Sequence, residues 1–220
     1  MTRWKTVNQK IVLVFDFDGV LVDSYNSIRD FYTKIIRRYV NISSWEGELL
    51  HQYEILADKI GLLREDWWFE LIPGITNELY DELITRYWEH RINTTTSMPG
   101  AHEVLKELGK KNILVSISFR DDIYGLKKFR IEHHGFAKYF QDIIVVGEDF
   151  GTRADAFNYI RNKYGDKQFV YIDDKIINLW KLSKHCPWIK LIHFSQGEEE
   201  INIEGVVRIN SLFELLYLFS

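Results

Sequence analysis

The amino-acid sequence predicts an α/β fold, with a Rossmann-like parallel sheet core and an inserted α-helical cap subdomain. Two observations lead to this prediction. Six short apolar runs alternate with amphipathic stretches along most of the chain, and such alternation is typical of parallel strands joined by crossover helices. The alternation is interrupted between Asp23 and Ser97, where no convincing strand-like run occurs.

The six apolar runs are the predicted strands. They are continuous or nearly so, as expected of strands that helices cover on both faces. In chain order they span residues 11–15, 113–118, 142–146, 169–172, 189–194 and 206–209.

Amphipathic stretches between these runs are predicted to be helices. The first places Val104, Leu105 and Leu108 on one face and follows Pro99 and Gly100, which signal a helix start. The predicted helices cover residues 101–110, 154–164 and 176–184.

The interruption is much longer than an ordinary strand-to-helix connection of about 2–6 residues. Residues 24–40, 46–60 and 75–90 within it have helical character, and several helices need a packing surface of their own. We therefore expect an α/β core made of residues 1–20 and 98–220 and a helical cap made of residues 21–97. The alternative is a single long crossover. The adjacent Trp67 and Trp68 are expected to lie in the core of the cap.

Composition excludes several classes of function. Apolar residues make up 46% and charged residues 27% of the chain, and the net charge is −4. This is an ordinary globular composition, and the charge is too small to indicate a nucleic-acid partner. The glycine-rich loops that bind ATP or NAD and the histidine spacings that bind zinc do not occur.

Cysteine content and the N-terminal residues bear on location. Cys186 is the one cysteine, so neither an intrachain disulfide nor a cysteine metal site is expected, and Cys186 is expected to be a packing residue. The first apolar run follows a polar, basic segment and is cut by acidic residues. It is too short and too charged for a signal peptide or a membrane span, so we expect a cytoplasmic protein with no membrane partner.

Two acidic pairs stand where predicted strands end. Asp16 and Asp18 follow the first apolar run, and Asp173 and Asp174 follow the fourth. Residues i and i+2 of a strand point to one face, and like charges placed there repel each other and lose hydration. The carboxyl ends of parallel strands meet at the edge where ligands bind, so both pairs, together with Ser118, are predicted to lie at that edge.

The acidic pairs indicate a metal and a reaction. Mg²⁺ prefers carboxylates, waters and substrate phosphate as ligands. A carboxylate can attack phosphorus and form an aspartyl-phosphate, while the metal offsets phosphate charge. A second acid can protonate the leaving oxygen and then activate water. The alternative is a strand that simply ends in an acidic turn.

Motifs in this chain resemble those of the haloacid dehalogenase (HAD)-like hydrolase superfamily, in its phosphatase branch with a helical cap (phosphoglycolate phosphatase-like). Residues 16–20 (DFDGV) are similar to the first motif, and residues 118–120 (SFR) to the second. Residues 171–175 (YIDDK), followed by Asn178, are similar to the double-aspartate fourth motif. The return from the cap and the closing helix are matched by residues 98–101 (MPGA) and 209–216 (INSLFELL).

The resemblance implies a Mg²⁺-dependent phosphatase that acts on a small phosphorylated metabolite through an aspartyl-phosphate. Asp16 would be the nucleophile, and Asp18 the general acid/base whose backbone carbonyl also binds the metal. Asp173 and Asp174 would complete the metal site, directly or through water. An acid at position 18 favours phosphoryl transfer, because the family's dehalogenases lack one there.

The resemblance also implies which residues contact the substrate phosphate. Ser118 and Gly19 would do so, together with a cation from the third motif, which is normally a lysine. Arg153 is the best positional match, with Lys175 or another base as the alternative, and Arg153 could instead cap a solvated helix. Ser116, two residues before Ser118, is a rival for the hydroxyl role.

Other interpretations of the sequence stay open. A phosphomutase acting on a sugar phosphate would use the same intermediate, and a non-catalytic HAD-like binding or regulatory module could retain the same pocket. Lys127 and Lys128 are expected to lie on a solvated face. The identity of the substrate and the oligomeric state do not follow from the sequence.

Overall fold

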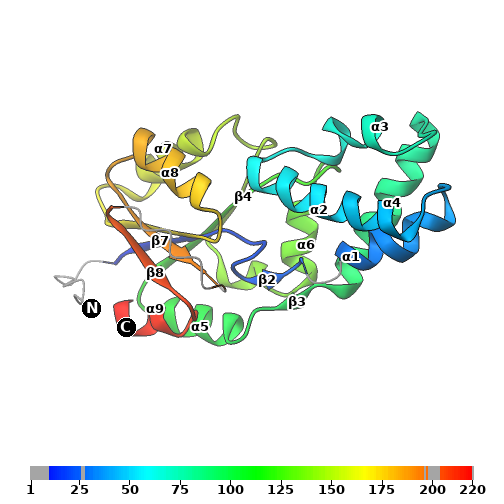
Figure 1. Ribbon diagram of the computed structural model, residues 1–220. Helices are drawn as coiled ribbons and strands as arrows, with labels where there is room; N and C mark the ends of the chain where they lie inside the picture. The colour runs from blue at the N-terminus through cyan, green and yellow to red at the C-terminus, as the bar shows by residue number, and fades with distance from the viewer. Residues whose placement is uncertain (1–9, 26–27, 196, 198–203, 220) are drawn as a thin grey trace. The chain divides into compact units, whose positions relative to one another are not determined.

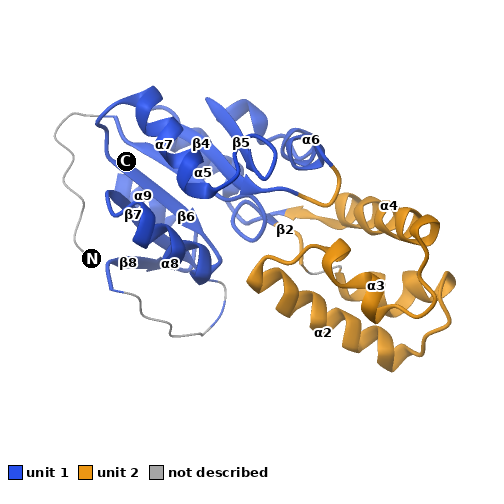
Figure 2. Ribbon diagram, turned by 90° about the horizontal axis from the view of Figure 1, so that it is seen from above, with its two compact units in different colours: residues 1–22, 97–120, 124–220 blue, residues 23–96, 121–123 orange. Residues whose placement is uncertain are grey.

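A computed structural model describes residues 10–25, 28–195, 197 and 204–219 of the chain (Figure 1). The chain divides into two compact units (Figure 2). Unit 1 comprises residues 1–22, 97–120 and 124–220, and unit 2 comprises residues 23–96 and 121–123. The chain leaves unit 1 within the two-residue strand β2 (Val22–Asp23) and returns to it within β3 (Thr96–Ser97). These two strands pair with each other.

Unit 1 contains a six-stranded parallel sheet with the strand order β5-β4-β1-β6-β7-β8. The predicted α/β class and all six predicted strands are confirmed, with bounds that differ by at most one residue. The strands are β1 (Val12–Phe15), β4 (Ile113–Phe119), β5 (Asp142–Val146), β6 (Phe169–Asp173), β7 (Ile189–Phe194) and β8 (Val206–Ile209).

Helices cover both faces of this sheet. Side chains alternate along β1, so that Leu13 and Phe15 enter one hydrophobic core and Val12 and Val14 enter the other. The first core is shared with α5, α6 and α9, and the second with α7 and α8. The helix bounds are α5 (Ala101–Leu108), α6 (Leu126–His133), α7 (Arg153–Tyr164), α8 (Ile176–His185) and α9 (Glu214–Phe219).

The predicted packing role of Cys186 is confirmed. The residue is 1% exposed and belongs to the second core. Burial raises the pKa of its thiol, which keeps it protonated and unreactive.

Unit 2 is helical. Its longer helices are α2 (Ser44–Ile60) and α4 (Asn77–Thr94), accompanied by the short α1 (Ile28–Asp30) and α3 (Trp68–Leu71). Ser43 caps α2 through a capping box with Glu46. Among the described residues, none of the helices combines the length and the apolar character needed to cross a bilayer.

The helix predicted over residues 24–40 is broken up in the structure. After α1 the chain forms one π-helical segment, Phe31–Ile35, and then a 3-10 turn, Ile36–Arg38. This segment packs tightly on α2, because a Cβ atom at Gly47 would come within 2.5 Å of the Tyr32 carbonyl oxygen. The irregular backbone thus accompanies a close approach that periodicity does not reveal.

Aromatic side chains fill the centre of unit 2. Trp67 and Trp68 are 2% and 0% exposed, as expected for residues of a cap core. The Trp68 ring stacks on Phe31 with the ring centroids 6.0 Å apart, and its Nε1 donates a hydrogen bond to the Tyr32 hydroxyl.

A buried network of charges lies within the same unit. Arg64 forms ion pairs with Glu54 and with Asp122, the latter at 2.8 Å, and all three side chains are at most 6% exposed. Asp122 follows β4 in the sequence but belongs to unit 2. It also accepts hydrogen bonds from the Arg64 backbone N–H and from Trp88 Nε1. A buried ion pair of this kind is costly to break from one side only.

Replacing Asp122 with alanine is therefore expected to destabilise unit 2 by about 3–5 kcal/mol, because Arg64 would keep a buried charge with a lost partner. The measurement is the free energy of unfolding in urea. The control is Lys34→Gln, which removes an exposed ion pair with Asp30 and should cost less than about 1 kcal/mol. Equal effects of the two substitutions would contradict the buried network.

Candidate active site

Three carboxylates meet at the carboxyl ends of two neighbouring strands. Asp16 follows β1, Asp173 ends β6, and the Asp16 backbone N–H donates a 3.0 Å hydrogen bond to the Ile172 carbonyl. One carboxylate oxygen from each of Asp16, Asp173 and Asp174 lies within 4.8 Å of the others. The two acidic pairs of the sequence are therefore brought together through these three residues, in parallel register.

The loop after β1 turns sharply at Gly19. Its φ is +77°, a left-handed conformation that favours glycine. A Cβ atom at this position would also come within 2.1 Å of Asp174 Oδ2. Gly19 is thus required both by the turn and by the carboxylate that packs against it, and it places the first-motif loop directly beside the fourth motif.

Ser118 lies at the carboxyl end of β4, next to β1. It is fully buried, and its Oγ accepts a 3.0 Å hydrogen bond from the Phe17 backbone N–H. The rival Ser116 lies one strand repeat further from this edge, and its Oγ has no hydrogen-bond partner among the described residues. The geometry therefore associates Ser118, and not Ser116, with the acidic loop.

Neighbouring groups fix the orientation of the Asp173 carboxylate. It accepts hydrogen bonds from the Lys175 backbone N–H at 2.7 Å, from Asn178 Nδ2 at 2.9 Å and from the Tyr171 hydroxyl. Asn178 belongs to the first turn of α8. Such hydrogen bonds orient a carboxylate as a metal ligand.

Arg153 lies beside the same carboxylate. It opens α7 after the N-cap residue Thr152, and its Nη2 is 3.8 Å from Asp173 Oδ2. Its guanidinium lies over the Tyr171 ring, and its side chain is 15% exposed. Arg153 is therefore not a solvated helix cap, and it supplies a fixed positive charge next to the acidic cluster.

Asp18 lies apart from the three clustered carboxylates and faces α6. Its two carboxylate oxygens contact Arg130, which is fully buried, and Lys127, whose side chain is 6% exposed. The expectation that Lys127 lies on a solvated face is therefore wrong. Lys128 fits that expectation better, since its side chain is 44% exposed and pairs with Asp149.

Helix α6 was not predicted from the sequence, because it buries charged side chains and exposes an aromatic one. Its buried residues are Lys127, Arg130 and Ile131, whereas Phe129 is 51% exposed. An apolar periodicity search does not find a helix whose inner face is charged. The available signal was the spacing i, i+3, i+4 of two cations and one aliphatic residue shortly after the second motif.

Burial and crowding alter the charge of Asp16. Burial, followed by repulsion from Asp173, raises the pKa of Asp16 to about 6, even though Arg153, Lys127 and Lys175 act in the opposite direction. Burial and the Asp173 charge together therefore disfavour the ionised form of Asp16 more than the three cations favour it.

The residues present fit a hard divalent cation. The donor set consists of three carboxylates with ligand atoms close to one another, and oxygen donors of this kind suit Mg²⁺ in a site that it completes with waters and substrate phosphate. A bound cation would also offset the repulsion from Asp173, which adds to burial in raising the pKa of Asp16.

A fold with a parallel sheet, an acidic cluster at its carboxyl edge and an inserted helical unit is the architecture of a HAD-type hydrolase. The sequence model of the haloacid dehalogenase-like hydrolase family matches residues 12–179. This match covers well over half of the chain, and the chain therefore belongs to the haloacid dehalogenase-like hydrolase family. A search of curated proteins gave no match.

Solved structures share the fold at low sequence identity. A predicted phosphoglycolate phosphatase from Haemophilus somnus superposes with a TM-score of 0.67 and 14% identity over 98% of this chain and 100% of its own. YfnB from Bacillus subtilis, classed as a HAD-hydrolase and solved bound to magnesium, gives 0.65 and 15% over 96% and 99%. A HAD-superfamily hydrolase from Geobacter sulfurreducens gives 0.65 and 16% over 96% and 97%.

The raised pKa of Asp16 predicts a pH-dependent stability in metal-free buffer. Asp16 titrates near 3.8 in an unfolded chain and near 6 in the folded one. Below pH 3.8 Asp16 is protonated in both states, so its burial has little effect on the free energy of unfolding. Above pH 6 the carboxylate is ionised in both states, and its burial lowers the free energy of unfolding by about 3 kcal/mol. Asp16→Asn is therefore expected to stabilise the protein by about that amount at pH 8.

The measurement is urea unfolding of both proteins with EDTA present. The gain should shrink steadily as the pH falls from 6 towards 3.8. A gain that is equally large at pH 4 and pH 8 would show that removal of the buried charge is not its source.

Proposed function

We propose that this chain is a Mg²⁺-dependent phosphatase that hydrolyses a small phosphorylated metabolite through an aspartyl-phosphate on Asp16. The observation that carries the proposal is the cluster of Asp16, Asp173 and Asp174 at one sheet edge. A buried hydroxyl on β4 and a partly buried cation at the start of α7 adjoin this cluster. A phosphoryl group needs this combination of a nucleophile, a metal site, a hydrogen-bond donor and a fixed positive charge.

Asp16 would attack phosphorus with one carboxylate oxygen. With a pKa of about 6, it is mostly ionised at neutral pH, and a cation nearby shifts the balance further towards the ionised form. Asp16, Asp173, Asp174 and the Asp18 backbone carbonyl would hold Mg²⁺. When bound, this ion would offset the charge of the phosphate and align it for in-line attack.

Ser118, Gly19 and Arg153 would bind the phosphoryl oxygens. Because Ser118 Oγ accepts a hydrogen bond from the Phe17 N–H, the hydroxyl keeps its own proton to donate to substrate. Arg153 would take the role of the lysine found in related third motifs. It keeps its charge at every relevant pH, while Asp173 and Tyr171 hold its side chain in place.

Asp18 would act as general acid and then as general base. It would protonate the leaving oxygen in the first step and take a proton from water in the second, when water attacks the aspartyl-phosphate. Arg130 and Lys127 pair with its carboxylate, which is the form that would act as the general base; to act as the acid in the first step, Asp18 must first take up a proton. A dehalogenase needs no such acid, so the residue favours phosphatase over dehalogenase chemistry.

The relatives support this proposal in two respects. The Haemophilus somnus protein is described as a predicted phosphoglycolate phosphatase, and the Bacillus subtilis protein was solved with magnesium. A single buried cysteine is also compatible with a reducing compartment, and we propose that the protein acts in the cytoplasm.

Replacing Asp16 with asparagine is expected to lower kcat for an aryl phosphate by at least about a thousandfold with Mg²⁺ present, because the amide cannot form the covalent intermediate. The assay is release of inorganic phosphate. The matched control is Asp149→Asn, which removes a carboxylate of unit 1 that pairs with the exposed Lys128 and should leave kcat unchanged.

Undiminished turnover by Asp16→Asn would remove Asp16 from the reaction. The same assay with a sugar phosphate separates two outcomes of one intermediate: free phosphate indicates a phosphatase, whereas an isomeric sugar phosphate indicates a mutase. Binding of Mg²⁺ without turnover over a wide panel would favour a non-catalytic module.

A further inference from the structure

An apolar stripe runs along the exposed side of α2 in unit 2. It consists of Trp45, Leu49, Tyr53, Leu56 and Ile60, whose surfaces are between 38% and 68% exposed. We call these five residues the α2 stripe. At 100° per residue they fall within about 80° of arc. The adjoining side of the helix, which includes Leu50 and Ala57, is buried, so α2 has an inner face and a second, outer apolar face.

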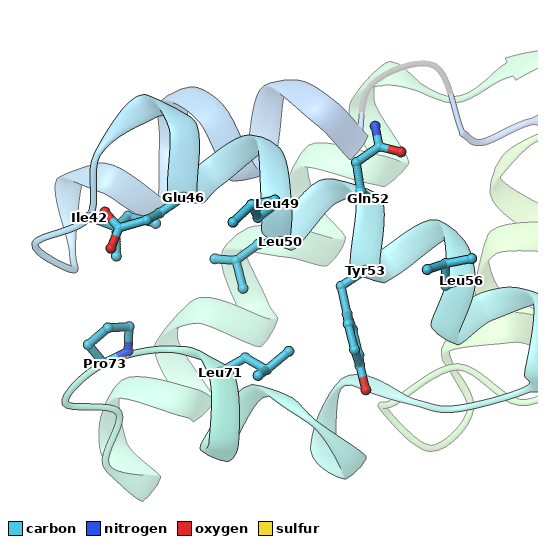
Figure 3. Close-up of a pocket in the computed structure, with 9 residues that line it drawn as sticks. All are labelled: Ile42, Glu46, Leu49, Leu50, Gln52, Tyr53, Leu56, Leu71 and Pro73. Carbon is cyan, nitrogen blue, oxygen red and sulfur yellow. The ribbon is translucent and has the colours of Figure 1, made fainter.

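A groove borders the α2 stripe (Figure 3). Its volume is about 410 Å³, and it lies between α2 and residues 71–73. Figure 3 shows Leu50 and Tyr53 pointing from α2 towards Leu71 on the far side. Leu71 itself is 42% exposed. The helix thus presents a row of apolar side chains with a hollow beside it, which is the arrangement that receives the side chains of a second helix.

We propose that the α2 stripe binds a second copy of this chain, with the two α2 helices packed antiparallel. The stripe is nearly symmetric about its centre. Its members are spaced by 4, 4, 3 and 4 residues. Read from the C-terminal end of the helix, the spacing is 4, 3, 4 and 4, which is almost the same. An antiparallel pair centred between Gln52 and Tyr53 therefore places Trp45 against Ile60 and Leu49 against Leu56, twice. A two-fold contact requires self-complementarity of this kind.

Charged residues flank the stripe on both sides. Glu48, which also pairs with the more exposed Arg29 of its own chain, and Lys59 lie on the same flank of the stripe near its two ends, and Glu46 lies on the other flank. In an antiparallel two-fold pair, each flank of the stripe faces the same flank of the second copy, so Glu48 comes close to Lys59 of the second copy. In a parallel pair, each flank would face the other flank of the second copy, and Glu48 would lie near Glu46 of that copy. The charges therefore select the antiparallel arrangement.

The exposed area of the stripe is large enough for a weak dimer. Five large side chains, each roughly half exposed, offer on the order of 500 Å² per copy, or about 1,000 Å² for the pair. A specific interface begins at about this size. The expected dimer is therefore modest in affinity and dissociates on dilution. A patch of about 500 Å² is in the upper part of the range for the largest apolar patch of a monomer, and such patches are often functional.

The test is sedimentation equilibrium of the full chain over about a hundredfold range of concentration. The expected result is a monomer–dimer equilibrium. Leu56→Glu is expected to weaken the dimer by at least about a hundredfold, because the substitution introduces a charge into the apolar contact twice. Leu56 is 61% exposed, so the variant should keep its melting temperature, which is measured in parallel. The control is Tyr217→Glu, at a residue of unit 1 that is 79% exposed and should not alter association.

Charge reversal tests the orientation. Lys59→Glu and Glu48→Lys are each expected to weaken the dimer, and the double variant is expected to restore it. A monomer at every concentration would overturn the proposal, as would a dimer that Leu56→Glu leaves unchanged. A tighter dimer in Glu48→Lys alone would overturn the antiparallel arrangement. All these readouts are independent of phosphatase activity, so they stand or fall separately from the proposed function.

Discussion

The repulsion among three carboxylates at one sheet edge is the constraint on which the rest of the structure depends. Asp16 and Asp173 are nearly inaccessible, and Asp174 lies against the loop that carries Gly19. Parallel pairing of β1 with β6 leaves no freedom to separate them. A chain that buries these charges together needs a compensating cation, and we take the divalent ion of the proposed reaction to supply it.

The protein's own cations are distributed in a way that supports this account. Arg153 Nη2 comes only within 3.8 Å of Asp173 Oδ2. In the proposed function its guanidinium would therefore also be able to contact a bound phosphate. Arg130 and Lys127 are committed to Asp18 instead. Asp18 of the proposed mechanism thus has two cations in direct contact, whereas Asp16, whose pKa stays raised despite Arg153, Lys127 and Lys175, would gain most from a metal ion.

Most of the core could be predicted from the sequence because its strands are continuous apolar runs, and Asp16, Ser118 and Asp173 follow from where those runs end. Helix α6 could not be predicted in this way, since it buries the charged side chains of Lys127 and Arg130, and their partner, Asp18, is distant in sequence. The π-helical segment after α1 was hidden for a related reason: its backbone accommodates a close approach to Gly47. Likewise, the pairing of Arg64 with Asp122 depends on tertiary contacts that neither residue signals alone.

The central claim is that the carboxylate cluster binds a divalent cation, and isothermal titration of the metal-free protein with Mg²⁺ tests it most directly. We predict one ion per chain at pH 8, with affinity that falls below pH 6 as Asp16 takes up a proton, and with binding lost in Asp173→Asn. Binding that is absent in the folded wild-type protein, or that persists unchanged in Asp173→Asn, would contradict the account.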